Sequence, residues 1–110
     1  MKLSMKERFQ LLKLLPKEGN VTTLRMVHDL RLALAPSEKE QEAIGLKQTA
    51  GGYVSWDPRL EEAYEIGGLD RPKAQALVAD ALEQLDKQDR LTEDLLDLWD
   101  RFVEGAEGGD

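Results

Sequence analysis

Cysteine is absent from this chain of 110 residues, and histidine occurs only once, as His28. Without cysteine the chain can form no disulfide, no thiolate nucleophile and no cysteine-based zinc site. A catalytic triad would have to use His28, and a metal site with two histidines cannot be built. We therefore expect no catalytic residue, no cofactor-binding site and no metal site, and we predict that the protein is not an enzyme.

Long hydrophobic runs and phosphate-binding glycine motifs are also lacking. No apolar stretch approaches the roughly 20 residues that a membrane-spanning helix needs. The glycine pairs at 51–52 and 67–68 lack the spacing of nucleotide-binding loops, so we interpret them as turns. Near the N-terminus the apolar stretch 11–15 is interrupted by Lys13 and followed by Pro16, which is not the pattern of an export signal. We expect a cytoplasmic protein that does not bind membranes.

Charge is distributed unevenly along the chain. The total is 22 acidic and 15 basic side chains, a net charge of −7. Residues 1–35 hold seven basic and three acidic side chains, a net +4, so the remaining residues, 36–110, carry −11. The acidic remainder argues against a broad nucleic-acid footprint, although solvated faces of one domain would show the same asymmetry. With 41% hydrophobic residues, we expect a single globular domain over 1–104 and a flexible glycine-containing tail over 105–110.

Apolar periodicity and capping residues predict about five helices. Ser4 and Ser37 are each followed three residues later by glutamate, which is the spacing of a capping box, and Pro16 and Pro36 end the first two helices. We expect the other helices to be capped by Thr22 or Thr23, by Asp70 and by Thr92. The last two helices show the clearest apolar stripes. The expected helices lie near 5–15, 23–35, 38–43, 71–85 and 93–103.

A change of period after Gly45 predicts a small antiparallel sheet. β-forming residues on both sides of Ala50-Gly51-Gly52 indicate a hairpin over 46–56. The alternating segment 63–66 is a candidate third strand, and Asp57-Pro58 leaves a helix over 58–66 as the alternative. The predicted fold class is therefore helix-rich α+β. Three helices followed by a hairpin also give the N-terminal part a winged-helix-like order.

Carboxylates form an unusual stripe on the last predicted helix, at spacings i, i+4, i+7 and i+11. Such like charges repel by a few tenths of a kcal/mol per pair, and the last two also oppose the helix dipole. The stripe is either simply solvated or a docking surface for a protein partner with a basic surface. Among the aromatic residues, Trp56 is the one we most readily assign to an interface. The four carboxylates belong to Glu93, Asp97, Asp100 and Glu104.

A winged-helix-like regulator that binds nucleic acid through the basic N-terminal helices is the alternative. Its candidate phosphate contacts would be Lys13, Lys17, Arg25 and Arg31. In that fold the third helix enters the major groove, but the segment 38–43 carries three glutamates and one lysine. Phosphates would repel this helix, so we do not expect it to bind DNA.

Several short segments resemble small uncharacterised proteins encoded by phages and prophages. They are LLKLLPKEGN at 11–20, TL at 23–24, DLR at 29–31, WDP at 56–58, EIG at 65–67 and LTED at 91–94, within a similarity over about residues 3–103. No known activity or binding residue comes with the resemblance. It implies an intracellular phage accessory protein, either an inhibitor of a host factor or a virion or assembly component, in the host cytoplasm. The resulting prediction is a non-enzymatic protein-protein interaction module that docks through its acidic helical face.

Overall fold

The first two helices begin and end where capping residues and proline place them. The computed structural model describes residues 1–60 and 62–104, so the predicted tail 105–110 lies outside the described residues. Helix α1 (Met5–Leu14) starts with a complete capping box, in which the Glu7 amide donates to the Ser4 hydroxyl and the Ser4 amide donates to the Glu7 carboxylate. Helix α2 (Val21–Leu34) follows and ends before Pro36.

Two expected helix caps are wrong, and a third is correct only in its position. Asn20 caps α2 instead of Thr22 or Thr23, because its Oδ1 accepts a 2.8 Å hydrogen bond from the Thr23 amide. Helix α4 (Pro72–Lys87) starts after Arg71, and the Asp70 carboxylate lies 3.2 Å from the amino nitrogen of Met1 instead of capping the helix. Thr92 precedes the next helical turn but makes no side-chain cap. For Asp70, a contact with the distant N-terminus thus replaces local capping.

The predicted hairpin is confirmed, and the third strand exists in a different sheet. Strands β2 (Lys47–Gln48) and β3 (Val54–Ser55) pair antiparallel across a turn in which Gly52 has a positive φ of 79°. Strand β4 (Tyr64–Glu65) excludes a helix over all of 58–66. Among the described residues of this range, only the 3₁₀ turn η1 (Pro58–Leu60) is helical. The partner of β4 is β1 (Lys2–Leu3), a strand that was not predicted. The sheet is therefore two separate antiparallel pairs.

The last helix is not the continuous α-helix that the apolar stripe predicts. It begins as the 3₁₀ turn η2 (Glu93–Leu95), continues as α5 (Leu96–Trp99) and ends as the π-helical segment η3 (Asp100–Glu104). Phe102 and Val103 are both buried in η3. Neighbouring residues of a regular α-helix diverge by about 100°, so the wider π turn is suited to burying this adjacent pair.

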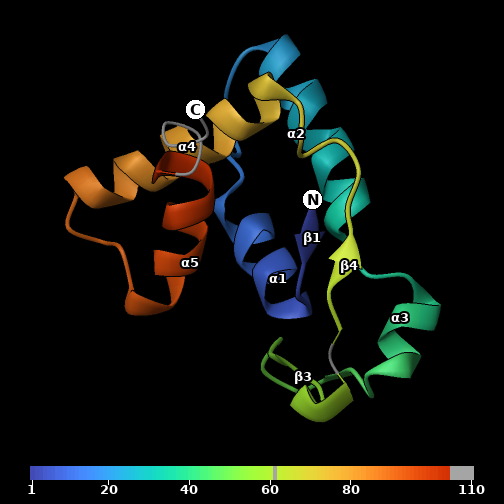
Figure 1. The fold of residues 1–110 in the computed structure, drawn as a ribbon. Helices are drawn as coiled ribbons and strands as arrows, with labels where there is room; N and C mark the ends of the chain where they lie inside the picture. The colour runs from blue at the N-terminus through green and yellow to red at the C-terminus, as the bar shows by residue number, and fades with distance from the viewer. Residues whose placement is uncertain (61, 105–110) are drawn as a thin grey trace.

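The hydrophobic core joins the two ends of the chain. α4 packs against α1 and η3, and α1 also packs against α2 (Figure 1). The short helix α3 (Glu38–Ala43) and the β2–β3 hairpin lie to one side of these helices. With α1 to α5 in the part of the chain that the structure describes, the fold is helix-rich α+β, as predicted. Buried members of the core cluster are Leu3, Leu11, Leu15, Val27, Leu30, Leu34, Ile66, Leu69, Ala74, Val78, Leu82, Leu98, Phe102 and Val103.

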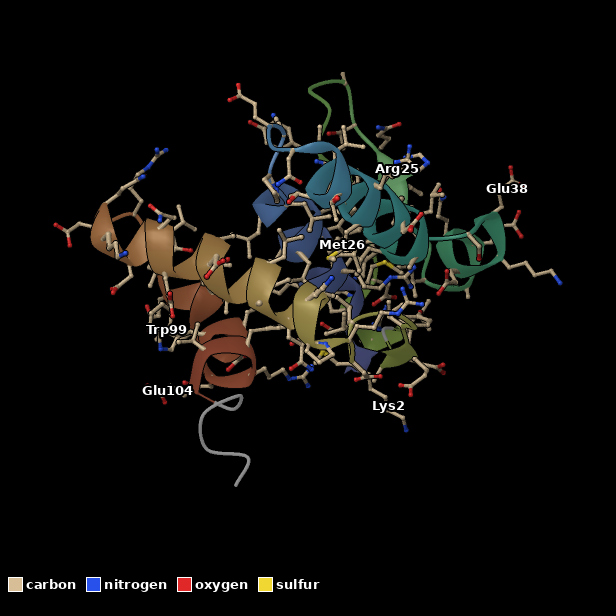
Figure 2. The ribbon with its side chains drawn as sticks, turned by 90° about the horizontal axis from the view of Figure 1, so that it is seen from above. Lys2, Arg25, Met26, Glu38, Trp99 and Glu104 are labelled. Carbon is tan, nitrogen blue, oxygen red and sulfur yellow. The ribbon has the colours of Figure 1, made fainter. Side chains whose placement is uncertain are left out.

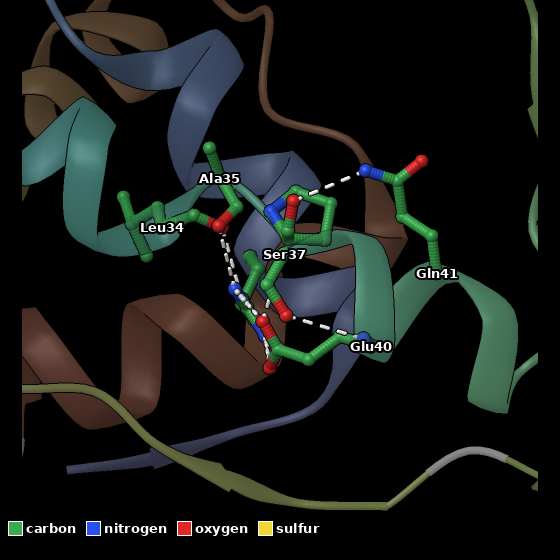
Figure 3. Close-up of polar contacts among 7 residues, drawn as sticks. Leu34, Ala35, Ser37, Glu40 and Gln41 are labelled. Carbon is green, nitrogen blue, oxygen red and sulfur yellow. Dashed lines mark hydrogen bonds and ion pairs between the residues drawn. The ribbon is translucent and has the colours of Figure 1, made fainter.

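One buried arginine connects α3 to this core. Arg8 on α1 is 1% exposed; its Nε donates to the Leu34 carbonyl at 2.9 Å, and one terminal nitrogen donates to the Ala35 carbonyl at 3.0 Å. The guanidinium also binds both oxygens of Glu40, at 2.6 and 3.2 Å, and lies 5.2 Å from the centre of the Tyr64 ring. Figure 3 shows Glu40 beside Leu34 and Ala35, while its backbone amide donates to Ser37. Arg8 therefore satisfies the C-terminal carbonyls of α2 and holds the start of α3.

The Arg8–Glu40 pair makes stability depend on pH. The hydrogen bonds from Arg8 hold the pKa of Glu40 below its ordinary value near 4.5. A lowered carboxyl pKa adds stability that is present above the unfolded-state value and is lost as the pH falls through the folded-state value. Urea unfolding from pH 7 down to pH 3 should show a falling free energy, and Glu40→Gln should make this slope shallower. An identical slope in the Glu40→Gln variant would contradict this linkage.

Candidate functional site

The acidic side chains meet α1 at a hollow of about 420 Å³, here called the acidic hollow. One wall is the start of α1 with its cap, and the other is the segment from η2 to η3. Asp97 and Asp100, both predicted, lie on the second wall together with Asp94, which was not part of the predicted stripe. The complete lining is Ser4, Lys6, Glu7, Gln10, Asp94, Asp97, Asp100 and Arg101.

Asp94 is the acidic residue that is fixed by the fold. The Thr92 hydroxyl donates to one carboxylate oxygen, and the side-chain nitrogen of Gln10 donates to the other at 3.0 Å and to the Asp94 carbonyl at 3.1 Å. These hydrogen bonds, the one from Thr92 foremost, lower the pKa of Asp94, and the positive charge of Lys6 adds to the effect. The bonds from Gln10 join the two walls of the acidic hollow.

Asp97 and Asp100 are exposed, and their carboxylates differ from that of Asp94, which Thr92 and Gln10 hold by hydrogen bonds. Arg101, which also lines the acidic hollow, points its guanidinium to the Lys2 carbonyl at 2.8 Å and to the Glu7 carboxylate at 3.4 Å. Over residues 1–60 and 62–104, no side chain donates a hydrogen bond to the carboxylate of Asp97 or Asp100. Both carboxylates can therefore accept hydrogen bonds from a partner without breaking one from a side chain in the described part of the chain.

The structure brings together only part of the predicted carboxylate stripe. Glu93 and Glu104 are exposed at the two ends of the helical segment but do not line the acidic hollow. Figure 2 shows Glu104 across the molecule from Arg25, so the acidic helical segment and the outer side of α2 face different directions. Gln10 and Glu7 line the wall of the acidic hollow that α1 forms. The carboxylate stripe could not predict this wall, because the stripe lies on a different helix.

A second hollow of about 410 Å³, here called the apolar hollow, lies between α1, α4 and η2. Four of its eight lining residues are aliphatic and half-buried, and the other four are polar or charged. Gln10 and Asp94 line this hollow as well as the acidic one, so the two are continuous. The full lining is Gln10, Lys13, Leu14, Ala81, Leu85, Thr92, Asp94 and Leu95.

Trp56, the aromatic residue assigned to an interface, is half-buried and packs against α1. Its ring lies 5.5 Å from that of Phe9, with an angle of 33° between the planes. Tilted aromatic pairs at this distance are attractive. The ring helps to attach the hairpin to α1, on a part of the molecule separate from the acidic hollow.

The four basic residues considered for nucleic-acid binding do not line one common hollow. Lys17 and Arg31 line a hollow of about 280 Å³ together with His28, which is exposed. Lys13 lines the apolar hollow, and Arg25 lines neither of these. A phosphate backbone is best bound by a continuous row of cations, so this arrangement does not favour the nucleic-acid alternative.

The described residues contain no group of three or more histidine, aspartate or glutamate side chains placed to hold a metal ion. In the same part of the chain, every helix is too short or too polar to span a bilayer. None of the protein-family models, curated proteins or solved structures compared with the chain matches it. The predicted order of three helices followed by a hairpin is present, but the likeness to a winged-helix fold stays a prediction from the sequence.

Proposed function

We propose that the protein is a non-enzymatic interaction module that docks a protein partner with a basic surface at the acidic hollow. The observation that carries this proposal is the pair Asp97 and Asp100, two exposed carboxylates in one hollow to which no side chain of residues 1–60 and 62–104 donates a hydrogen bond. Lysine or arginine side chains of a partner would pair with these carboxylates, and Asp94 is already positioned beside them. Such charge complementarity supplies orientation and a fast association rate.

The resemblance to small phage and prophage proteins supports a further part of the proposal. We propose that the partner is met in the cytoplasm of a host cell. The protein would act there either as an inhibitor of a host factor or as a virion or assembly component. If the partner's basic surface is its own catalytic or binding site, the protein would act as an inhibitor, because docking would block that site.

The charge pair can be tested with a fluorescent lysine decapeptide as the probe. Replacing Asp97 and Asp100 with lysine turns two attractive contacts into repulsive ones, so we expect binding of the decapeptide to weaken by about tenfold or more. The measurement is fluorescence anisotropy at low and at physiological salt, since exposed charge pairs are screened by salt. Unchanged affinity would overturn the proposal that these residues dock a basic partner.

A matched control keeps the total charge change and moves it elsewhere. Asp80 and Asp86 are exposed on α4 and line none of the hollows described above. The double variant Asp80→Lys with Asp86→Lys should bind the decapeptide almost as the unchanged protein does. An equal loss of affinity in both double variants would mean that only net charge matters, and the acidic hollow would then have no special role.

A further inference from the structure

The apolar hollow adjoins the proposed docking site, and the inference here rests on the proposed function. The two hollows meet at Gln10 and Asp94, whose hydrogen bonds form the boundary between them. One continuous surface therefore offers carboxylates on one side of Asp94 and aliphatic side chains on the other. A partner that only presented cations would leave the aliphatic side uncovered.

The apolar hollow is large enough for one or two side chains of a partner, and part of its lining is apolar. At about 410 Å³ it lies within the range of about 300–1,000 Å³ that is usual for binding sites. Leu14, Leu85 and Leu95 come from three different elements and leave apolar surface in contact with water. Covering this surface with an aliphatic or aromatic side chain would remove apolar area from water and so stabilise the complex.

Charge fixes how the occupant lies. Lys13 lines the apolar hollow but not the acidic one, whereas Asp97 and Asp100 line only the acidic one. Lys13 and Asp94 balance each other at the apolar hollow, whereas four acidic residues of the acidic hollow outnumber its two bases, Lys6 and Arg101. A cation of the partner is therefore attracted mainly at the acidic hollow. The favoured occupant has its positive side chains at Asp97 and Asp100 and its apolar side chain beside Leu14 and Leu85.

We propose that the apolar hollow anchors an aliphatic or aromatic side chain of a basic amphipathic segment belonging to another protein. The lysines or arginines of this segment lie over the acidic hollow. The segment thus combines an apolar anchor, which supplies most of the affinity, with charges that set its orientation. The need for an apolar anchor distinguishes this partner from one that presents only positive charges.

Two peptides of equal charge test this inference. One is a decapeptide that alternates pairs of lysines with pairs of leucines, and the other has serines in place of the leucines. We expect the leucine peptide to bind the unchanged protein at least about tenfold more tightly than the serine peptide. Ala81→Phe, which fills the apolar hollow from α4, should abolish this difference and leave the affinity for the serine peptide unchanged.

A second variant guards against effects of Ala81→Phe on folding. Leu85→Ala removes part of the apolar lining and should weaken the leucine peptide by about threefold to tenfold, with far-ultraviolet circular dichroism reporting that each variant is folded. If both peptides bind equally and Ala81→Phe has no effect, the anchor is disproved while the acidic docking site stands. If neither peptide binds with an affinity that depends on Asp97 and Asp100, the proposed function fails as well.

Discussion

Replacing Arg8 with alanine should lower the free energy of unfolding by about 3–5 kcal/mol. The substitution leaves the partly buried carboxylate of Glu40 without its cation, and it leaves the buried carbonyl of Leu34 and the partly buried carbonyl of Ala35 without their donors. Losing one partner of a buried, hydrogen-bonded charge pair costs more than the pair contributes, because the remaining polar groups stay desolvated. Urea denaturation followed by circular dichroism measures the difference.

Three further variants identify the cause of that loss. Arg25→Ala removes an exposed arginine and should change the free energy of unfolding by no more than about 0.5 kcal/mol. Arg8→Lys keeps the charge but cannot reproduce the planar fork of donors, so it should fall between the unchanged protein and Arg8→Ala. If Arg8→Ala does not fold, Glu40→Gln still tests the pair. A loss below about 1 kcal/mol for Arg8→Ala would show that the buried arginine is not important for stability.

Replacing Phe102 with alanine should cost about 3–5 kcal/mol as well, for a different reason. The ring is 1% exposed and belongs to the core cluster that η3 shares with α4 and α1. Its removal forfeits the transfer free energy of the aromatic ring and leaves a cavity that the packed helices can close only in part. The same urea experiment reports the loss, with thermal unfolding as an independent measurement.

Leu96→Ala is the matched control for Phe102→Ala. Leu96 is 50% exposed in the same helical segment, so its truncation should cost no more than about 1 kcal/mol. Phe102→Leu fills part of the same space and should cost less than Phe102→Ala. Equal losses for Leu96→Ala and Phe102→Ala would contradict the assignment of Phe102 to the centre of the core.

The elements that the sequence predicts correctly are those whose signals are local. The capping boxes at Ser4 and Ser37 and the hairpin at Gly51-Gly52 each depend on residues a few positions apart. Strand β1 was missed because two residues are too short to show alternation. The burial of Arg8 could not be predicted, since Leu34 and Glu40, which bind its guanidinium, lie 26 and 32 positions away.

The candidate site was predicted only in part, for the same reason. Helical spacing brought Asp97 and Asp100 together correctly, because these two residues are on one short segment. Gln10 donates a hydrogen bond to Asp94, which lies 84 positions later in the chain, and no periodicity of the sequence predicts that contact. The change from 3₁₀ to α and then to π geometry also alters the angle between successive carboxylates, so Glu93 and Glu104 fall outside the acidic hollow.

The pairing of β1 with β4 has a consequence for the order of folding events. The backbone amide of Ile66 donates to the carbonyl of Met1, which is 65 positions earlier in the chain. Closing a flexible loop of that length costs roughly 4 kcal/mol in chain entropy, before any neighbouring contact compensates for it. The helical hairpin of α1 and α2 needs no such closure and is free to form first. The short strand at the start of the chain is therefore suited to be a late addition that closes an already collapsed helical core.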